Sequence, residues 1–150
     1  MTGKTDTRDL DDETLREAAV AAARGDRPFD MLIRGGTLID MVTGERRAVD
    51  IGLVGPLIAS VHPQDARLDA HETIDASGLI LSPGLIDTHM HVESSMITPA
   101  AYAAATLPRG VTTLVWDPHE LGNVHGITGI DWAAEAARAL PQRHVLLAPS

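Results

Sequence analysis

The sequence predicts an α/β protein in which one helix and a small antiparallel sheet precede the first strands of a parallel sheet. Residues 12–24 place small and apolar side chains at helical spacing, and residues 30–81 form short apolar runs separated by Gly and Pro. After Pro83, apolar strand-like segments alternate with helix-like segments, a pattern typical of βαβ units. We therefore expect two sheets of different kinds in this chain.

Composition and charge exclude several classes of function. The chain has 150 residues, of which 44% are hydrophobic and 3% aromatic, so the expected core is aliphatic. A formal net charge of −9 argues against a nucleic-acid partner or an anionic membrane surface, because both attract Lys and Arg. The chain has no cysteine, so any metal must be bound by His, Asp or Glu. No segment is long and apolar enough for a membrane span and no signal peptide is visible, so we expect a cytoplasmic protein.

The first 28 residues are predicted to form a frayed end and one surface helix. Residues 1–10 are polar, and Asp11 or Asp12 is suited to cap a helix that runs to about Arg24. Gly25 follows as a stop signal. The apolar stripe of this helix is weak and consists mostly of alanine, so we expect it to pack on the body of the protein with one face.

Residues 29–82 are predicted to form a small sheet as a second segment. Gly35-Gly36 is expected to be a turn between two short strands, and Gly55-Pro56 a turn between two longer ones. Further strands are expected at residues 72–75 and 79–81. Close strands joined by such turns indicate an antiparallel arrangement. His62 and His71 lie in this segment and are expected to be surface residues.

Residues 83–150 are predicted to contain three parallel strands and two helices. The strands are expected at 85–91, 111–116 and 144–148, and the helices at 99–107 and 132–140, with Asp131 as cap of the second helix. A closed parallel barrel needs eight strand–helix units. These residues would therefore be the start of a (β/α)8 TIM-like barrel.

Asp87, His89 and His91 are the most informative residues of the chain. They alternate along a strand, so we expect their side chains on one face, at the carboxyl end where parallel α/β folds gather functional groups. His89 and His91 together could bind one divalent metal ion, and water activated by such an ion hydrolyses unreactive C–N bonds. Asp87 lies two residues before His89 on the same expected face, farther from the carboxyl end of the strand. It either fixes an imidazole by a hydrogen bond or is simply a polar residue with satisfied hydrogen bonds.

The motif Asp117-Pro118-His119-Glu120 follows the next predicted strand, at the matching position. Glu120 or His119 could reach a metal, a water molecule or a substrate there, and the alternative is an ordinary turn, because Asp-Pro often starts one. Residues 123–126 are expected to continue this loop. The segment Glu93–Met96 is expected either to line the mouth of the site or, through Ser94 or Ser95, to cap the next helix.

Two levels of resemblance to a known family rest on these motifs. The segment Pro83–His91 reads Pro-Gly-Leu-Ile-Asp-Thr-His-Met-His and resembles the signature of the amidohydrolase superfamily. A sharper resemblance is to the bacterial adenine deaminases within that superfamily, and it extends over residues 12–150. It rests on the blocks His89–Met96, Gly110–Thr113, and Asp117–Glu120 followed by Asn123, Val124 and Gly126.

The resemblance implies an enzyme that converts adenine and water to hypoxanthine and ammonia. It implies a (β/α)8 barrel after a small β-sandwich domain, and two divalent metal ions, manganese or iron with zinc possible. His89 and His91 would bind one ion, and Glu120 or His119 would orient water or substrate. The partners would be a small purine substrate and a second copy in a homodimer. The other ligands would come from later strands, so we expect the 150-residue piece alone to be inactive.

Three alternatives remain at this point. The protein could be another amidohydrolase acting on a cyclic amide, similar to dihydroorotase or dihydropyrimidinase. It could be a non-catalytic module that keeps the fold for assembly or binding. Finally, His89 and His91 could be structural residues that bind no metal.

Overall fold

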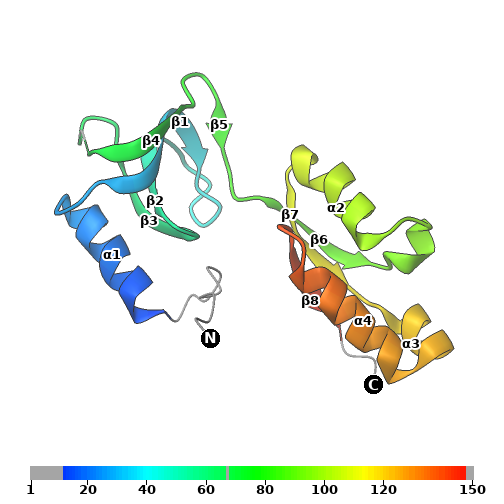
Figure 1. The fold of residues 1–150 in the computed structure, drawn as a ribbon. Helices are drawn as coiled ribbons and strands as arrows, with labels where there is room; N and C mark the ends of the chain where they lie inside the picture. Colours follow the sequence, from blue (N-terminus) through cyan, green and yellow to red (C-terminus); the bar gives the residue numbers. More distant parts are fainter. Residues whose placement is uncertain (1–11, 67, 148–150) are drawn as a thin grey trace. The chain divides into compact units, whose positions relative to one another are not determined.

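The structure is a computed structural model that describes residues 12–66 and 68–147. It divides into two compact units, Met1–Ser82 and Pro83–Ser150, each of which contains a sheet and at least one helix (Figure 1). The predicted α/β class is therefore confirmed. The frayed end, the alternative cap Asp11 and the last residue of the strand expected to end at Ala148 lie outside the described residues.

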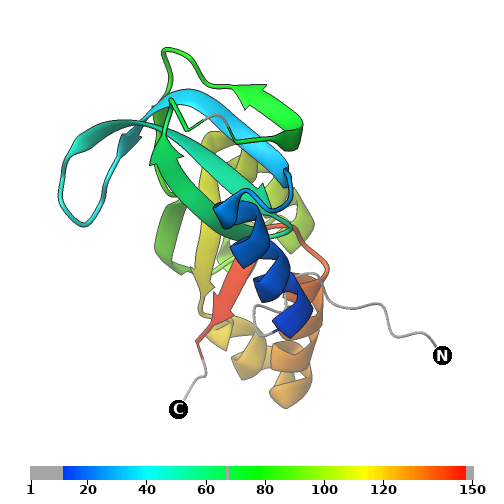
Figure 2. The same cartoon turned by 90° about the vertical axis from the view of Figure 1, so that its left-hand side faces the viewer.

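Helix α1 (Glu13–Arg24) has the ends that the sequence predicts. Asp12 Oδ1 accepts hydrogen bonds from the backbone N–H of Thr14 at 2.9 Å and of Leu15 at 3.3 Å. Gly25 ends the helix at φ 81°, in the left-handed region that favours glycine. Figures 1 and 2 show α1 lying along one face of the first sheet, next to β2 and β3.

The first sheet is mixed, which corrects the prediction of an antiparallel sheet. Its strands, in chain order, are β1 (Phe29–Ile39), β2 (Arg46–Val54), β3 (Leu57–Pro63), β4 (Ala70–Asp75) and β5 (Ile80–Leu81). The order in space is β3-β2-β1-β4, and β5 also pairs with β1. The β1–β2 and β2–β3 pairs are antiparallel as expected, but β4 and β5 both run parallel to β1. The prediction was wrong because sequence spacing does not reveal the direction from which a later strand returns.

Gly35 and Gly36 form a bulge within one long strand, so the predicted turn was wrong. The register of β1 against β2 shifts between Ile33 and Gly36, and Gly35 has φ 82°. The freed N–H of Gly35 donates to Asp50 Oδ1 at 2.8 Å, and Asp50 is buried. The two glycines therefore bend the strand instead of reversing it.

The core of the first unit forms between α1 and the sheet. Its buried residues are Ala19, Ala22, Phe29, Leu32 and Val54. His62 was expected at the surface, but only 9% of it is exposed and its ring stacks on Phe29 with 5.9 Å between centroids. His71 is exposed, as predicted. The imidazole of His62 is a flat, partly apolar side chain, and sequence pattern alone did not distinguish it from a solvated one.

The second unit contains the predicted parallel sheet. Its strands β6 (Leu85–Met90), β7 (Val111–Trp116) and β8 (Arg143–Leu146) lie in the order β6-β7-β8, all parallel. The connections contain η1 (Glu93–Ser95), α2 (Pro99–Thr106), η2 (Leu107–Arg109), α3 (His119–His125) and α4 (Ile127–Arg138). Helices α2 and α4 contribute to one core with β7, formed by Val92, Tyr102, Leu114, Trp116, Ala133 and Ala137. Strand, helix and strand therefore follow one another as βαβ units.

The connection between β7 and β8 contains more helix than predicted. Residues expected to form a loop after Glu120 belong to α3, and α4 begins at Ile127, so Asp131 lies inside a helix and not at its cap. Gly129 permits the close approach of the two helices, because a Cβ there would lie 2.6 Å from the backbone oxygen of Leu121. The Gly and Asn residues of α3 favour a loop locally, and tertiary packing of Leu121 on the core outweighs that preference.

Two smaller features complete the described part of the chain. Helix α2 is capped by Thr98, whose Oγ1 accepts from Ala101 N–H at 3.2 Å, and not by Ser94 or Ser95, which belong to η1. Among the described residues, no helix has the length and apolar character required to cross a membrane.

Candidate metal centre

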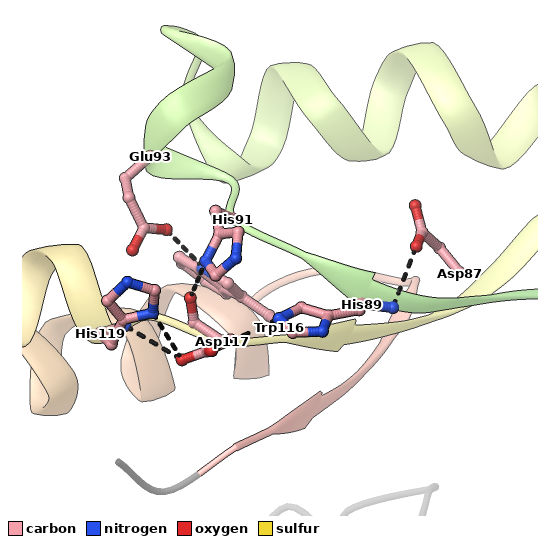
Figure 3. A network of polar contacts seen from close by, with 7 residues as sticks. All are labelled: Asp87, His89, His91, Glu93, Trp116, Asp117 and His119. Atoms are coloured by element: carbon pink, nitrogen blue, oxygen red, sulfur yellow. Dashed lines mark hydrogen bonds and ion pairs between the residues drawn. The ribbon is translucent and has the colours of Figure 1, made fainter.

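His89 and His91 come together at the carboxyl end of β6. Their rings are 4.9 Å apart between centroids, with His89 exposed and His91 half-buried. Figure 3 shows both side chains beside Asp117 and His119, which follow the neighbouring strand β7, while Asp87 lies apart from this group. The predicted histidine pair and the second predicted motif therefore meet at one end of the parallel sheet.

The ring orientation of His91 leaves one nitrogen for a ligand. Its Nδ1 lies 2.9 Å from the backbone oxygen of Asp117, so Nδ1 carries the proton and donates it to this carbonyl. Nε2 then has a free lone pair. Metal-binding histidines usually show this arrangement, in which a hydrogen bond on one nitrogen fixes the tautomer and the direction of the other.

Asp117 is the central carboxylate of the site. Its backbone N–H donates to the oxygen of Met90 at 2.9 Å, which extends the pairing of β6 with β7. Oδ2 lies 3.4 Å from Nε2 of His89, and Oδ1 lies 3.1 Å from Nδ1 of His119. Partial burial raises the pKa of Asp117. The hydrogen bonds and charge of His119, together with the charge of His91, lower this pKa by more than burial raises it, so the net pKa lies below its usual value.

His119 and Glu120 begin helix α3 on the other side of His91. The rings of His91 and His119 meet edge to face with 4.7 Å between centroids. The carboxylate of Glu120 accepts a hydrogen bond from the hydroxyl of Ser94 in η1. This bond joins the segment after β6 to the segment after β7, and it directs Glu120 toward the histidine cluster.

Two groups of possible ligands share His91. His89, His91 and Asp117 form one group, and His91, His119 and Glu120 form the other; within each group the ligand atoms lie within 4.8 Å of one another. Imidazole nitrogens combined with carboxylate oxygens suit divalent ions such as zinc, iron and manganese. The residues present therefore fit the divalent metal chemistry that the sequence predicts.

Asp87 contacts the backbone of His89 and not an imidazole. Its Oδ1 accepts from His89 N–H at 3.3 Å, and its Oδ2 accepts from the hydroxyl of Tyr102 at 3.0 Å. Burial raises the pKa of Tyr102, as do its hydrogen bond to Asp87 and the charge of that carboxylate. The hydroxyl therefore stays protonated and donates at neutral pH.

Sequence reasoning named Asp117 only as the start of a motif or of a turn, and Glu93 only as one of the residues that could line the mouth of the site. Asp117 is the first residue after β7, and that position in a parallel α/β sheet was a sufficient signal for a functional carboxylate. Glu93 Oε2 accepts from Trp116 Nε1 at 2.7 Å, whereas its buried Oε1 has no hydrogen-bond partner among the described residues. Nothing in the spacing of the sequence indicated the pairing of Glu93 with a tryptophan.

Comparison with known proteins connects this geometry to a family. Residues 80–150 match the amidohydrolase family. Over these residues the chain is similar to the amidohydrolases. An adenine deaminase 2 of Rhizobium johnstonii is 67% identical over 149 residues, which cover 99% of this chain and 25% of that relative. An adenine deaminase 2 of Agrobacterium fabrum is 69% identical over 142 residues, covering 95% of this chain and 24% of the relative. The chain thus spans about a quarter of the length of the curated relatives that it matches.

Solved structures similar to this chain include proteins with bound metal. A D-aminoacylase studied for its binuclear metal center has a TM-score of 0.51 and 36% identity, over 59% of this chain and 18% of that one. An N-acyl-D-glutamate deacylase from Bordetella bronchiseptica, complexed with zinc and a phosphonate inhibitor, has a TM-score of 0.51 and 32% identity, over 60% of this chain and 19% of that one. The chain is thus similar to metal-dependent hydrolases in both sequence and structure.

Proposed function

We propose that the protein carrying this chain hydrolyses adenine to hypoxanthine and ammonia. The observation that carries the proposal is the convergence of His89, His91 and Asp117 at the ends of two adjacent parallel strands. The high identity to adenine deaminases supports adenine as the substrate, since the residues of this cluster lie within the matched region.

His89 and His91 would hold one divalent ion, and the carboxylate of Asp117 would contribute to the same ligand group. A bound divalent ion supplies Lewis-acid chemistry and lowers the pKa of water, which makes hydrolysis of a C–N bond possible at neutral pH. We propose two ions in the active protein, with manganese or iron as the active metals and zinc as an alternative. The binuclear metal center of the similar D-aminoacylase supports this number of ions.

The chain's own residues would orient adenine and move protons. One oxygen of Glu120 accepts a hydrogen bond from Ser94, so its other oxygen can accept a hydrogen bond from water or from the 6-amino group. His119 has Nδ1 engaged by Asp117, so its Nε2 can contact a ring nitrogen of the purine. The water oxygen adds to C6, its protons pass to the ring nitrogen and the departing amine, and ammonia leaves.

We also propose the larger architecture that goes with this activity. The parallel order β6-β7-β8, with helices between the strands, supports the start of a (β/α)8 barrel over residues 83–150. Residues 29–82 would be part of a small β-sandwich domain, preceded in the sequence by helix α1 (Glu13–Arg24). The active protein would be a homodimer.

The test measures ammonia and hypoxanthine produced from adenine by the manganese-loaded protein expressed from its complete gene. We expect equal amounts of both products, lost in His89→Ala and retained in His71→Ala, because His71 is an exposed histidine of the other unit. A folded, metal-loaded protein that releases no ammonia from adenine contradicts the proposal. Hydrolysis of a cyclic amide by the same preparation would assign it to that class of substrate.

A further inference from the structure

Strand β6 contains a bulge that includes His89, the first histidine of the pair. Asp87 pairs with Leu114 of β7 and Met90 pairs with Trp116, so β6 takes one residue more than β7 to cover the same distance. An extra residue leaves its backbone groups outside the ladder and redirects the neighbouring side chains. Thr88 and His89 lie between these paired positions. The direction of the His89 side chain therefore depends on how the bulge is held.

Asp87 provides the hydrogen bond that holds the bulge. Its Oδ1 accepts from His89 N–H at 3.3 Å, a local side-chain-to-backbone contact across two residues. Its other oxygen, Oδ2, accepts from the hydroxyl of Tyr102 at 3.0 Å. Asp87 thus has one bond to the bulge and one to helix α2, and the second bond restricts the rotation of the carboxylate.

Tyr102 is itself fixed by packing. Only 8% of it is exposed, and it belongs to the core that also contains Leu114 and Trp116. The side chain of His89, in contrast, is 57% exposed, so packing contributes little to its orientation. Tyr102, a rigid core residue, is therefore linked through the carboxylate of Asp87 to His89, whose exposed side chain must be oriented.

We propose that Tyr102 is a positioning residue of this site: its hydroxyl holds Asp87, and Asp87 holds the backbone of His89 so that the imidazole faces its partners. The inference rests on the proposed ligand role of His89. In the held arrangement, Nε2 of His89 is 3.4 Å from Asp117 Oδ2 and the ring is 4.9 Å from that of His91. The hydroxyl is not needed to fill the core, since phenylalanine has the same ring.

The experiment compares Mn²⁺ affinities of metal-free protein expressed from its complete gene, in wild type, Tyr102→Phe, Asp87→Asn and Asp87→Ala. Tyr102→Phe is expected to weaken Mn²⁺ binding roughly tenfold or more, as is usual when a group supporting a metal ligand is removed. Asp87→Asn keeps an oxygen for His89 N–H and should lose less affinity than Asp87→Ala. Combining Tyr102→Phe with Asp87→Ala should add nothing, because both act through the same chain of bonds.

The matched control is Thr106→Val on the same helix. Thr106 Oγ1 donates to the backbone oxygen of Tyr102 at 2.9 Å and accepts from Gln142, but contacts neither Asp87 nor His89 in the described hydrogen bonds. This variant should lower the melting temperature and leave Mn²⁺ affinity unchanged. Equal Mn²⁺ affinities in Tyr102→Phe and Thr106→Val would overturn the positioning role.

Two further outcomes separate this inference from the proposed function. If His89→Ala binds Mn²⁺ as tightly as wild type, His89 is not a ligand and the positioning role is overturned with it. If Tyr102→Phe weakens Mn²⁺ binding as expected while the wild type releases no ammonia from adenine, the positioning role is supported and the proposed reaction is contradicted.

Discussion

Nδ1 of His91 and the backbone oxygen of Asp117 are 2.9 Å apart, and this hydrogen bond joins the end of β6 to the end of β7 together with the bond from Asp117 N–H to the oxygen of Met90. It directs Nε2 of His91 toward the cluster of side chains beside it. It also brings Asp117 next to His89, although the two residues are far apart in the sequence. The geometry of the candidate centre therefore depends on the pairing of two parallel strands as much as on the identity of the histidines.

Asp117→Asn should weaken Mn²⁺ binding strongly. The amide removes the negative charge between His89 and His119 but keeps the size of the side chain. We expect affinity to fall by roughly tenfold to a hundredfold, measured by titration of the metal-free protein. Asp131→Asn, at an exposed position on α4, is the control and should bind normally. Unchanged affinity in Asp117→Asn would remove this carboxylate from the proposed centre.

Glu120→Gln should lower the turnover of adenine more than the binding of metal. Glutamine can still contact the hydroxyl of Ser94 but cannot carry a proton between water and the amine. We expect kcat to fall by roughly 10²- to 10⁴-fold, the range typical of removing a general acid–base group. Steady-state kinetics at saturating Mn²⁺ measure this effect, with the exposed Glu135→Gln as control. Loss of bound Mn²⁺ in Glu120→Gln would instead make Glu120 a ligand.

The strands of the chain were easier to predict than its exact connections. Local signals were sufficient for α1, with Asp12 and Gly25 at its ends, and for the parallel strands after Pro83. They were insufficient for the Gly35-Gly36 bulge, because the same two glycines also suit a turn. The outcome there depended on Asp50, a buried carboxylate from the neighbouring strand that accepts the freed N–H.

The candidate site was likewise predictable only in part from the sequence. Strand alternation and the position of the motifs predicted that His89, His91, His119 and Glu120 would lie near one end of the sheet. Asp87 was expected on the same strand face as the two histidines, but a bulge interrupts the alternation and its carboxylate contacts the backbone N–H of His89. Its contact with Tyr102 joins β6 to a separate helix, and such tertiary contacts have no local signal in the sequence.

His144 should make the protein less stable in acid. Burial lowers the pKa of this histidine, and neither of its ring nitrogens has a hydrogen-bond partner among the described residues. The unfolded chain therefore binds the proton more readily than the folded one, so stability is lost as the pH falls below about 6.5, the ordinary value for histidine. Melting temperatures between pH 8 and pH 5, with His144→Leu for comparison, measure the effect. An equally steep loss in His144→Leu would assign the acid sensitivity to other groups.

Gly52→Ala should destabilise the first sheet. A Cβ at this position would lie 2.5 Å from two ring atoms of Phe29, a fully buried core residue that cannot easily move. Overpacking of this kind costs about 1–3 kcal/mol of unfolding free energy. Gly44→Ala is the matched control, because its Cβ meets nothing within 4 Å and only its positive φ of 74° opposes the change. Urea denaturation should rank Gly52→Ala below Gly44→Ala in stability, and the reverse order would contradict a tight Phe29 contact.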